Sequence, residues 1–311
     1  MKEKQILGMF PGRLRERFRM LSGILDELQE IRLCADAPVR IISGDAEYFL
    51  NVTGELCHII TSCCWYISAG EMEQILDHIC SYSRYAYEEA IGQGFLTVPG
   101  GHRIGVSGEV ILGKDGQIKN MKYIRYMNIR IAHEVIGAAD CLMPLVHENG
   151  RLCNTLLVAP PGCGKTTMLR DLVRQISDGS NYAAGKQVGV VDERSEIAGC
   201  FMGMAGNRLG IRTDVLDGCP KVQGMMLLLR SMAPLVIAVD EIGSDRDKQA
   251  IQNILQCGCR VLATMHGSSM EEVRSRGIEK NMFERYVFMG KKNGKCTIVS
   301  VCKDLGEIIY D

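Results

Sequence analysis

A glycine-rich segment at residues 159–167 constrains the fold of this chain more than any other feature. It reads Ala-Pro-Pro-Gly-Cys-Gly-Lys-Thr-Thr, follows an apolar run at residues 155–159 and precedes a predicted helix over residues 165–176. A strand, a glycine-rich loop and a helix in this order are typical of a phosphate-binding loop, or P-loop. The usual pattern begins with Gly, and Ala159 stands at that tolerant position. The sequence therefore predicts an α/β domain that binds a nucleotide.

The residue types in this loop suit the groups of a bound nucleotide. Main-chain amides and the positive end of the helix dipole favour phosphate oxygens, and glycine lets the backbone approach them. We expect Lys165 to reach the β- and γ-phosphates of ATP, and Thr166 to ligate Mg²⁺. The predicted nucleotide-binding residues are Pro161, Gly162, Cys163, Gly164, Lys165, Thr166, Thr167 and, from a later segment, His266.

A second strand end carries two acidic residues. Residues 235–240 read Leu-Val-Ile-Ala-Val-Asp and are followed by Glu241. The apolar run is typical of a buried parallel strand, so the acids are expected at its carboxyl end. We predict that Asp240 holds Mg²⁺ together with Thr166, and that Glu241 polarises the attacking water as a general base.

Two further strand ends extend this predicted site. Residues 190–196 read Val-Val-Asp-Glu-Arg-Ser-Glu, in which Glu193 is a second candidate for orienting the water. A salt-bridged surface loop explains the same residues equally well. His266 follows a strand predicted at residues 260–265, where a neutral imidazole could donate to the γ-phosphate and so distinguish ATP from ADP. A lone histidine is more often structural, so this interpretation depends on the neighbouring motifs.

The chain is predicted to form two domains of different class. From about residue 151, strands predicted at 155–159, 188–192, 235–240 and 260–265 alternate with helical stretches, which is typical of a mainly parallel sheet with crossover helices. Residues 1–138 instead combine helical periodicity, which predicts an amphipathic helix over residues 14–28, with a β-meander over residues 94–132. We predict a smaller α+β N-terminal domain at residues 1–138, a connection at 139–150 and an α/β ATPase domain at 151–311.

Composition argues against several classes of function. The formal net charge is −1, from 36 basic and 37 acidic residues, so bulk electrostatic binding to nucleic acid is not favoured. The 14 cysteines contain no CxxC pair, which favours reduced thiols in a reducing cytoplasm over a zinc ribbon. No apolar stretch approaches the ~20 residues that a membrane span requires. We therefore expect a cytoplasmic protein that, if it works at a membrane, does so peripherally, from the surface or through partners.

Together, the four strand ends resemble the secretion-ATPase superfamily of P-loop ATPases, the motors of type II and type IV secretion and of pili. Residues 192–196 are similar to its acidic box, although the family often has Glu before Asp, which leaves open which carboxylate activates water. Residues 264–267 are similar to its histidine box, and residues 229–234 to the arginine-bearing run before the second acidic strand end. The resemblance implies a RecA-like ATPase domain and a hexameric ring.

A narrower resemblance covers roughly residues 30–305 and is to the stage III sporulation protein AA family. The segments that carry it include Glu-Ile-Arg-Leu at 30–33, Tyr-Ser-Arg-Tyr-Ala-Tyr-Glu at 82–88, Arg-Ile-Gly-Val-Ser-Gly-Glu at 103–109 and Asn-Ile-Arg-Ile-Ala at 128–132. It implies a mother-cell protein of endospore-forming bacteria. Such a protein would couple ATP hydrolysis to the assembly or operation of a channel between mother cell and forespore, with membrane-embedded channel proteins as partners.

The resemblance also suggests a catalytic role for arginines outside the P-loop domain. The family places its N-terminal domain over the nucleotide, and Arg103 and Arg130 are the candidates for stabilising the developing charge. Charged positions of a β-meander are an equally good explanation of both residues. Two other functions compete with the motor: an ATP-dependent single-stranded nucleic-acid translocase or remodeller, and a scaffold that binds nucleotide without turning it over.

Overall fold

The computed structural model describes residues 2–44, 46–114, 116–279, 282–292, 295–303 and 306–310. The chain divides into two compact units by its internal contacts. The first comprises residues 1–133 with 200–202, and the second comprises residues 134–199 and 203–311. None of the helices in the described ranges is both long enough and apolar enough to cross a membrane. Each unit is described below by itself.

The first unit is built on a seven-stranded sheet in the order β5-β4-β3-β1-β9-β8-β7. All six pairings between these strands are antiparallel. The strands of the first unit are β1 (Leu28–Cys34), β2 (Ala37–Pro38), β3 (Arg40–Ser43), β4 (Ala46–Leu50), β5 (Leu56–Cys57), β6 (Tyr66–Ile67), β7 (Phe95–Val98), β8 (His102–Leu112) and β9 (Ile118–Arg130), of which β2 and β6 pair with each other in a separate two-stranded sheet. Its helices are α1 (Lys2–Gly8), α2 (Gly12–Phe18), η1 (Arg19–Ile24), α3 (Ala69–Ile79), η2 (Arg84–Tyr87) and α4 (Glu88–Gly92).

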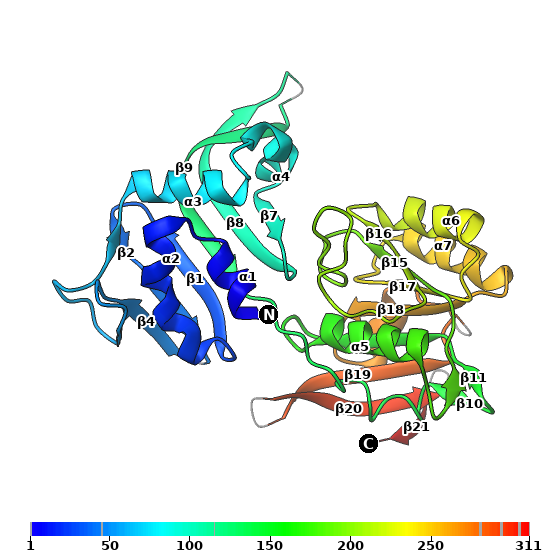
Figure 1. The fold of residues 1–311 in the computed structure, drawn as a ribbon. Helices are drawn as coiled ribbons and strands as arrows, with labels where there is room; N and C mark the ends of the chain where they lie inside the picture. The colour runs from blue at the N-terminus through cyan, green and yellow to red at the C-terminus, as the bar shows by residue number, and fades with distance from the viewer. Residues whose placement is uncertain are drawn as a thin grey trace. The chain divides into compact units, whose positions relative to one another are not determined.

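Helices α1, α2 and α3 cover one face of this sheet (Figure 1), and apolar side chains from the helices and the sheet form one core cluster. Alternation along β1 shows how the sequence produces this: Ile31 and Leu33 are buried, whereas Arg32 between them is exposed. Helix α3 begins at a capping box in which Ser68 accepts from the amide of Glu71. The opposite face of the sheet carries the polar and aromatic residues discussed below.

The second unit is built on an eight-stranded sheet in the order β16-β15-β17-β18-β12-β19-β20-β21. The pairings from β16 to β19 are parallel, and β20 and β21 are added antiparallel. The strands of the second unit, inside and outside this sheet, are β10 (His147–Glu148), β11 (Arg151–Leu152), β12 (Thr155–Ala159), β13 (Gly179–Ser180), β14 (Ala183–Ala184), β15 (Val188–Asp192), β16 (Thr213–Asp217), β17 (Val236–Val239), β18 (Arg260–His266), β19 (Arg285–Lys292), β20 (Lys295–Lys303) and β21 (Glu307–Tyr310). Its helices are α5 (Lys165–Asp178), α6 (Lys221–Ser231), α7 (Asp245–Gln256) and α8 (Met270–Ser275).

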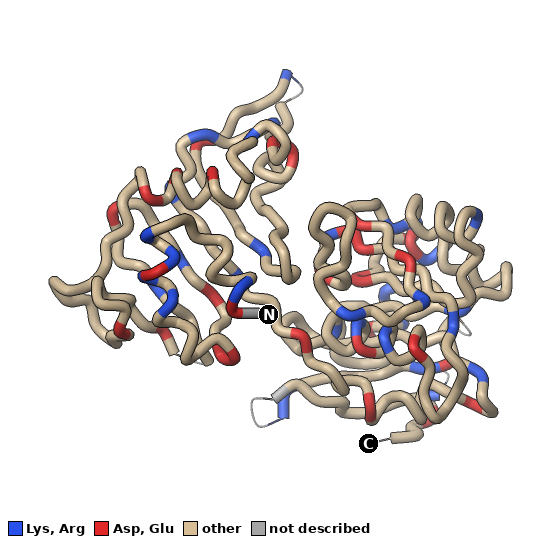
Figure 2. Tube along the Cα trace, in the orientation of Figure 1, with Lys and Arg blue, Asp and Glu red and all other residues tan. Residues whose placement is uncertain are grey.

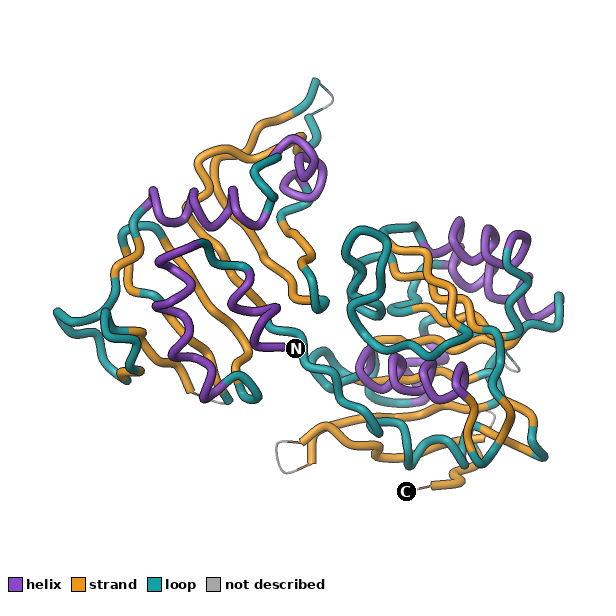
Figure 3. The backbone as a smooth tube through the Cα atoms, in the orientation of Figure 1, coloured by secondary structure: helices purple, strands orange, loops and turns teal. Residues whose placement is uncertain are grey.

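Every residue of β12, β15 and β17 is buried, as expected for central strands that are covered on both faces. Helices α6, α7 and α8 contribute to one apolar cluster with these strands, and α5 packs against β12 and β18. Residues 193–212 form one long loop between β15 and β16 (Figure 3). The predicted α/β class with a mainly parallel sheet, preceded by an α+β part, is confirmed.

Local predictions were accurate for the central strands and less so elsewhere. The predicted strands at 155–159 and 188–192 match β12 and β15. The residues predicted as a connection, 139–150, belong to the second unit by their contacts, and Ala139 and Leu142 are fully buried there. The division into domains at 138 and 151 stays a prediction.

Candidate nucleotide-binding site

Four parallel strands bring the predicted residues to one edge of the sheet. Strands β15, β17, β18 and β12 lie next to one another in that order, so their carboxyl ends meet on one side. Ala159 at the end of β12 is in register with His266 at the end of β18. Asp192 ends β15, and Asp240 follows β17 directly. Segments that lie up to about a hundred residues apart in the sequence thus share one site.

The P-loop backbone depends on two glycines. Gly162 and Gly164 have φ values of 71° and 76°, a left-handed conformation that other residues adopt at a cost. Gly164 is the N-cap of α5, and it has no side chain that could bond the first amides of the helix. Amides at a helix start that lack a side-chain cap suit the oxygens of an anion. The loop therefore fits a phosphate group.

Lys165 is directed into the loop rather than into solvent. Only 5% of the residue is exposed, and its Nζ donates to the carbonyls of Ala159 and Pro160 at 3.0 and 3.1 Å. Nζ also lies 3.1 Å from Nδ1 of His266. Burial lowers the pKa of the Lys165 amine, and the charges of Asp240 and Glu241 oppose that shift. The ammonium group is thus held at the edge of the sheet, close to two carboxylates.

Thr166 and Asp240 offer the oxygen ligands that a magnesium ion prefers. The Thr166 hydroxyl donates to Asp240 Oδ2 at 2.6 Å, and Thr264 on β18 donates to Oδ1 of the same carboxylate. Mg²⁺ is bound in proteins by one or two carboxylates and is completed by waters and phosphate oxygens. A hydroxyl and one carboxylate beside a phosphate-binding loop fit that chemistry. Thr264 lay within the predicted histidine box, but its contact with Asp240 was not predicted.

Glu241 has an unusual backbone conformation and contacts three neighbouring side chains. Its φ is 52°, a region that costs a non-glycine residue ~1–3 kcal/mol and is concentrated at functional sites. The Glu241 amide donates to Thr264 Oγ1 at 2.8 Å, and this hydrogen bond helps to hold the backbone in place. Its carboxylate contacts His266 Nε2 at 2.9 Å and Arg194 Nη1 at 2.7 Å.

These contacts assign the tautomer of His266. A lysine ammonium group can only donate, so Nδ1 of His266 accepts from Lys165 and the ring proton is on Nε2, which donates to Glu241. The imidazole is therefore neutral and links the P-loop lysine to the acidic strand end. The sequence predicted a neutral histidine near the phosphates, but not its bond to Glu241.

The acidic box divides into a structural and an accessible part. Asp192 is buried and accepts from the amides of Glu196, Ile197 and Ala198 at 2.8, 3.0 and 2.7 Å. Burial raises its pKa, and the hydrogen bonds from these amides oppose that shift. Glu193 is paired with Lys221 of α6. A small pocket lies between these residues and the second acidic strand end, lined by Asp192, Glu193, Arg194, Glu196, Lys221, Asp240 and Glu241.

Arg103 and Arg130 lie in the first unit, on adjacent strands. They are direct partners in the β8–β9 register, and the Arg103 guanidinium stacks 3.6 Å from the centre of the Phe95 ring. Their participation in catalysis stays a prediction.

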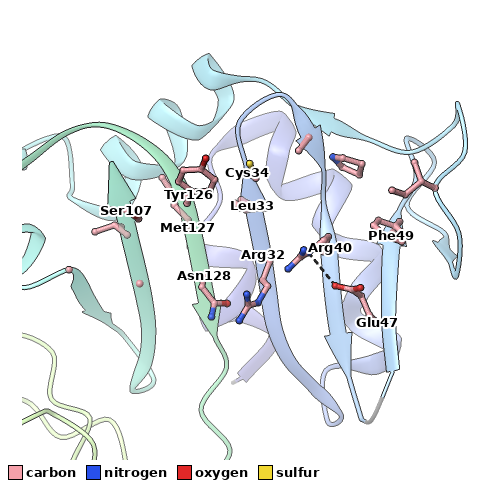
Figure 4. Close-up of a pocket in the computed structure, with 16 residues that line it drawn as sticks. Arg32, Leu33, Cys34, Arg40, Glu47, Phe49, Ser107, Tyr126, Met127 and Asn128 are labelled. Carbon is pink, nitrogen blue, oxygen red and sulfur yellow. Dashed lines mark ion pairs between the residues drawn. The ribbon is translucent and has the colours of Figure 1, made fainter. Parts of the chain in front are cut away.

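The same sheet presents a pocket of about 570 Å³ that the sequence did not predict. Arg32, Arg40 and Asn128 lie side by side across β1, β3 and β9, and Arg40 pairs with Glu47 (Figure 4). Asn128 Oδ1 is buried without a hydrogen-bond partner. Basic and acidic residues are interspersed along the described parts of both units (Figure 2).

Comparisons with solved structures identify the class of this fold. The pilus retraction motor PilT, solved with bound ADP, superposes with a TM-score of 0.57 at 15% identity, over 94% of this chain and 82% of that chain. The ATPase DotB of Legionella pneumophila superposes with a TM-score of 0.55 at 14% identity, over 92% of this chain and 79% of that chain. The fold is that of the secretion ATPases, with a RecA-like second unit, as predicted.

The sequence itself identifies the family. Residues 1–309 match the family described as "Sporulation stage III, protein AA". A protein of Bacillus subtilis (strain 168), "Stage III sporulation protein AA", is 36% identical over 288 residues, which cover 91% of this chain and 89% of that protein. The chain therefore belongs to the stage III sporulation protein AA family, and the predicted resemblance is confirmed.

Proposed function

We propose that this chain is an ATP-hydrolysing motor of the secretion-ATPase type. It would drive the assembly or operation of a channel between mother cell and forespore during endospore formation. The observation that carries this proposal is the contact series at the edge of the sheet. Lys165 contacts His266, His266 contacts Glu241, and Thr166 contacts Asp240. A loop that fits phosphate and an acidic strand end that fits a metal thus adjoin each other.

Different residues of the chain would bind the phosphates, hold the magnesium ion and orient the attacking water. The P-loop amides and Lys165 bind the β- and γ-phosphates, while Thr166 and Asp240 hold Mg²⁺. When bound, the magnesium ion neutralises phosphate charge. Glu241 orients the attacking water, with Glu193 as the alternative, and His266 responds to the γ-phosphate. Arg103 or Arg130 stabilises the developing charge from the first unit.

The quaternary and cellular parts of the proposal rest on family membership. A homohexamer would act from the cytoplasm of the mother cell, bound peripherally to membrane-embedded channel proteins of the sporulation apparatus. A size measurement by light scattering, with and without a non-hydrolysable ATP analogue, tests the ring. A nucleotide-dependent hexamer supports the motor, and a monomer at every nucleotide concentration contradicts it.

A steady-state ATPase assay tests the enzymatic core. Lys165→Ala should abolish turnover, because it removes the only ammonium group described within the loop. Lys292→Ala is the matched control, since Lys292 is an exposed lysine near the end of β19. Turnover by Lys165→Ala at the wild-type rate would refute the assigned site. Stimulation of the wild type by single-stranded RNA or DNA would instead favour the translocase.

A further inference from the structure

Two thiols meet at the P-loop. Cys163 lies within the loop and is buried, and Cys296 lies near the start of β20 and is exposed. Cys296 Sγ donates to the carbonyl of Gly162 at 3.4 Å. A Cβ added to Gly164 would lie 3.6 Å from Cys296 Cβ and 3.9 Å from its Sγ. Cys296 therefore lies against the residues on both sides of Cys163.

Two buried cysteines elsewhere in the fold provide a contrast. Cys80 and Cys259 are buried, and burial raises the pKa of each thiol to about 11, which suppresses the reactive thiolate. Burial also raises the pKa of Cys296, and Cys163 adds to that shift, but Cys296 keeps access to solvent. Access to solvent and a neighbouring thiol are two features of redox-sensing cysteines, whereas the raised pKa of Cys296 lowers the fraction of reactive thiolate.

We propose that Cys163 and Cys296 are a modification site that oxidation joins in a disulfide, and that this bond blocks nucleotide binding. Two S–H bonds break and one S–S bond forms. The two electrons and two protons pass to a two-electron oxidant such as hydrogen peroxide, which becomes two molecules of water. Disulfides in the cytosol are usually transient and of this sensing type.

The consequence for binding follows from where Cys163 sits. It is placed between Gly162 and Gly164, whose positive φ values shape the loop. A disulfide would tie this part of the loop to β20, a strand of the sheet's antiparallel extension, and would remove the freedom with which the amides close on phosphate. The block of binding rests on the proposed function, whereas the formation of the disulfide does not.

The first experiment maps the bond. The full-length chain is treated with hydrogen peroxide, alkylated, digested without reduction and analysed by mass spectrometry. A peptide that links Cys163 to Cys296 within a monomer is the expected result. A linkage found only in dimers separated under non-reducing conditions, or no linkage at all, would overturn the proposal.

The second experiment measures binding of a fluorescent ATP analogue to the reduced and oxidised chain. Oxidation should raise the apparent Kd at least tenfold, and dithiothreitol should restore the original value. Cys296→Ser and Cys296→Ala should bind as the wild type does and resist oxidation. Cys257→Ser, which removes an exposed thiol at the end of α7, should remain sensitive.

Equal sensitivity in both Cys296 variants would refute the role of the pair, and so would a mapped disulfide without loss of affinity. If the reduced wild type bound no analogue, the proposed function and the block of binding would fall together. The mapped peptide would still decide whether the site is oxidised. The two failures are therefore distinguishable.

Discussion

The buried carboxylate of Asp192 offers a sharp test of how the acidic box works. Its two oxygens accept hydrogen bonds from three consecutive backbone amides, those of Glu196, Ile197 and Ala198. Asp192→Ala would leave these amides without their acceptor at the start of the long loop over residues 193–212. We expect this substitution to destabilise the second unit far more than to remove a catalytic group.

The magnitude follows from the contacts. A hydrogen bond to a charged group is worth ~1.5–3 kcal/mol, so three bonds set an upper limit of ~4.5–9 kcal/mol. The raised pKa of Asp192 indicates that burying this carboxylate costs part of that sum. Leaving a buried donor without its acceptor costs about 1–3 kcal/mol, so the three amides predict a loss of at least about 3 kcal/mol for Asp192→Ala. Asp192→Asn keeps one acceptor oxygen but turns an amide donor toward a backbone donor, so about 2 kcal/mol is expected.

Two measurements check these values. Urea unfolding followed by circular dichroism gives the change in stability, and hydrogen exchange gives the protection of the amides at residues 196–198. Glu193→Gln is the matched control: its pair with Lys221 is partly exposed, so it should lose less than ~1 kcal/mol. If Asp192→Asn unfolded within ~0.5 kcal/mol of wild type and kept amide protection but lost turnover, the structural explanation would be wrong.

Three further predictions concern the site and its supports. Burial lowers the pKa of Lys165 below the 10.5 of an ordinary lysine, so the affinity for ATP should begin to fall at a pH below 10.5 as the ammonium group loses its proton. Lys165→Arg should remove this pH dependence in a binding titration. Arg194→Ala should lower the free energy of unfolding in urea by less than ~1 kcal/mol, because the arginine side chain is 59% exposed. It should nevertheless change kcat at saturating ATP. An unchanged kcat would show that the bond from Arg194 to Glu241 has no role in turnover. Ser244→Ala should lower stability by about 1 kcal/mol through loss of the capping box at α7, measured by thermal unfolding, while Ser244→Thr should retain most of it.

Sequence patterns predicted those parts of the fold that local physics determines. Strands β12 and β15 are continuous apolar runs that end in chemically distinct residues, and their bounds were predicted correctly. Strand β16 was missed because it is only partly buried and carries Asp214 and Asp217. The helical periodicity over residues 14–28 was misleading, since α2 ends at Phe18, a 3₁₀ helix follows, and Leu28 begins β1. Ser22 and Gly23, both poor helix formers, lie within that 3₁₀ helix.

The site shows the same limit at the level of single contacts. The residue types and strand ends were predictable because parallel strands place their carboxyl ends on one edge. The partners were not, because Arg194, Glu241 and His266 come from three separate loops and strand ends. No local pattern states that Asp192 would be bound by backbone amides, or that Cys296 would reach the P-loop from β20.

The contacts also bear on which carboxylate is better placed to orient water. Glu193 is bound by Lys221 from α6 and has no contact with Lys165 or His266 among those described. Glu241 is joined through the neutral His266 to Lys165, the residue that would meet the γ-phosphate. If Lys165 turned toward a bound phosphate, its hydrogen bond to Nδ1 of His266 would weaken, and the contact between His266 and Glu241 would change with it. Of the two carboxylates, Glu241 is the one that the described hydrogen bonds link to Lys165, and we therefore propose it as the stronger candidate for the general base.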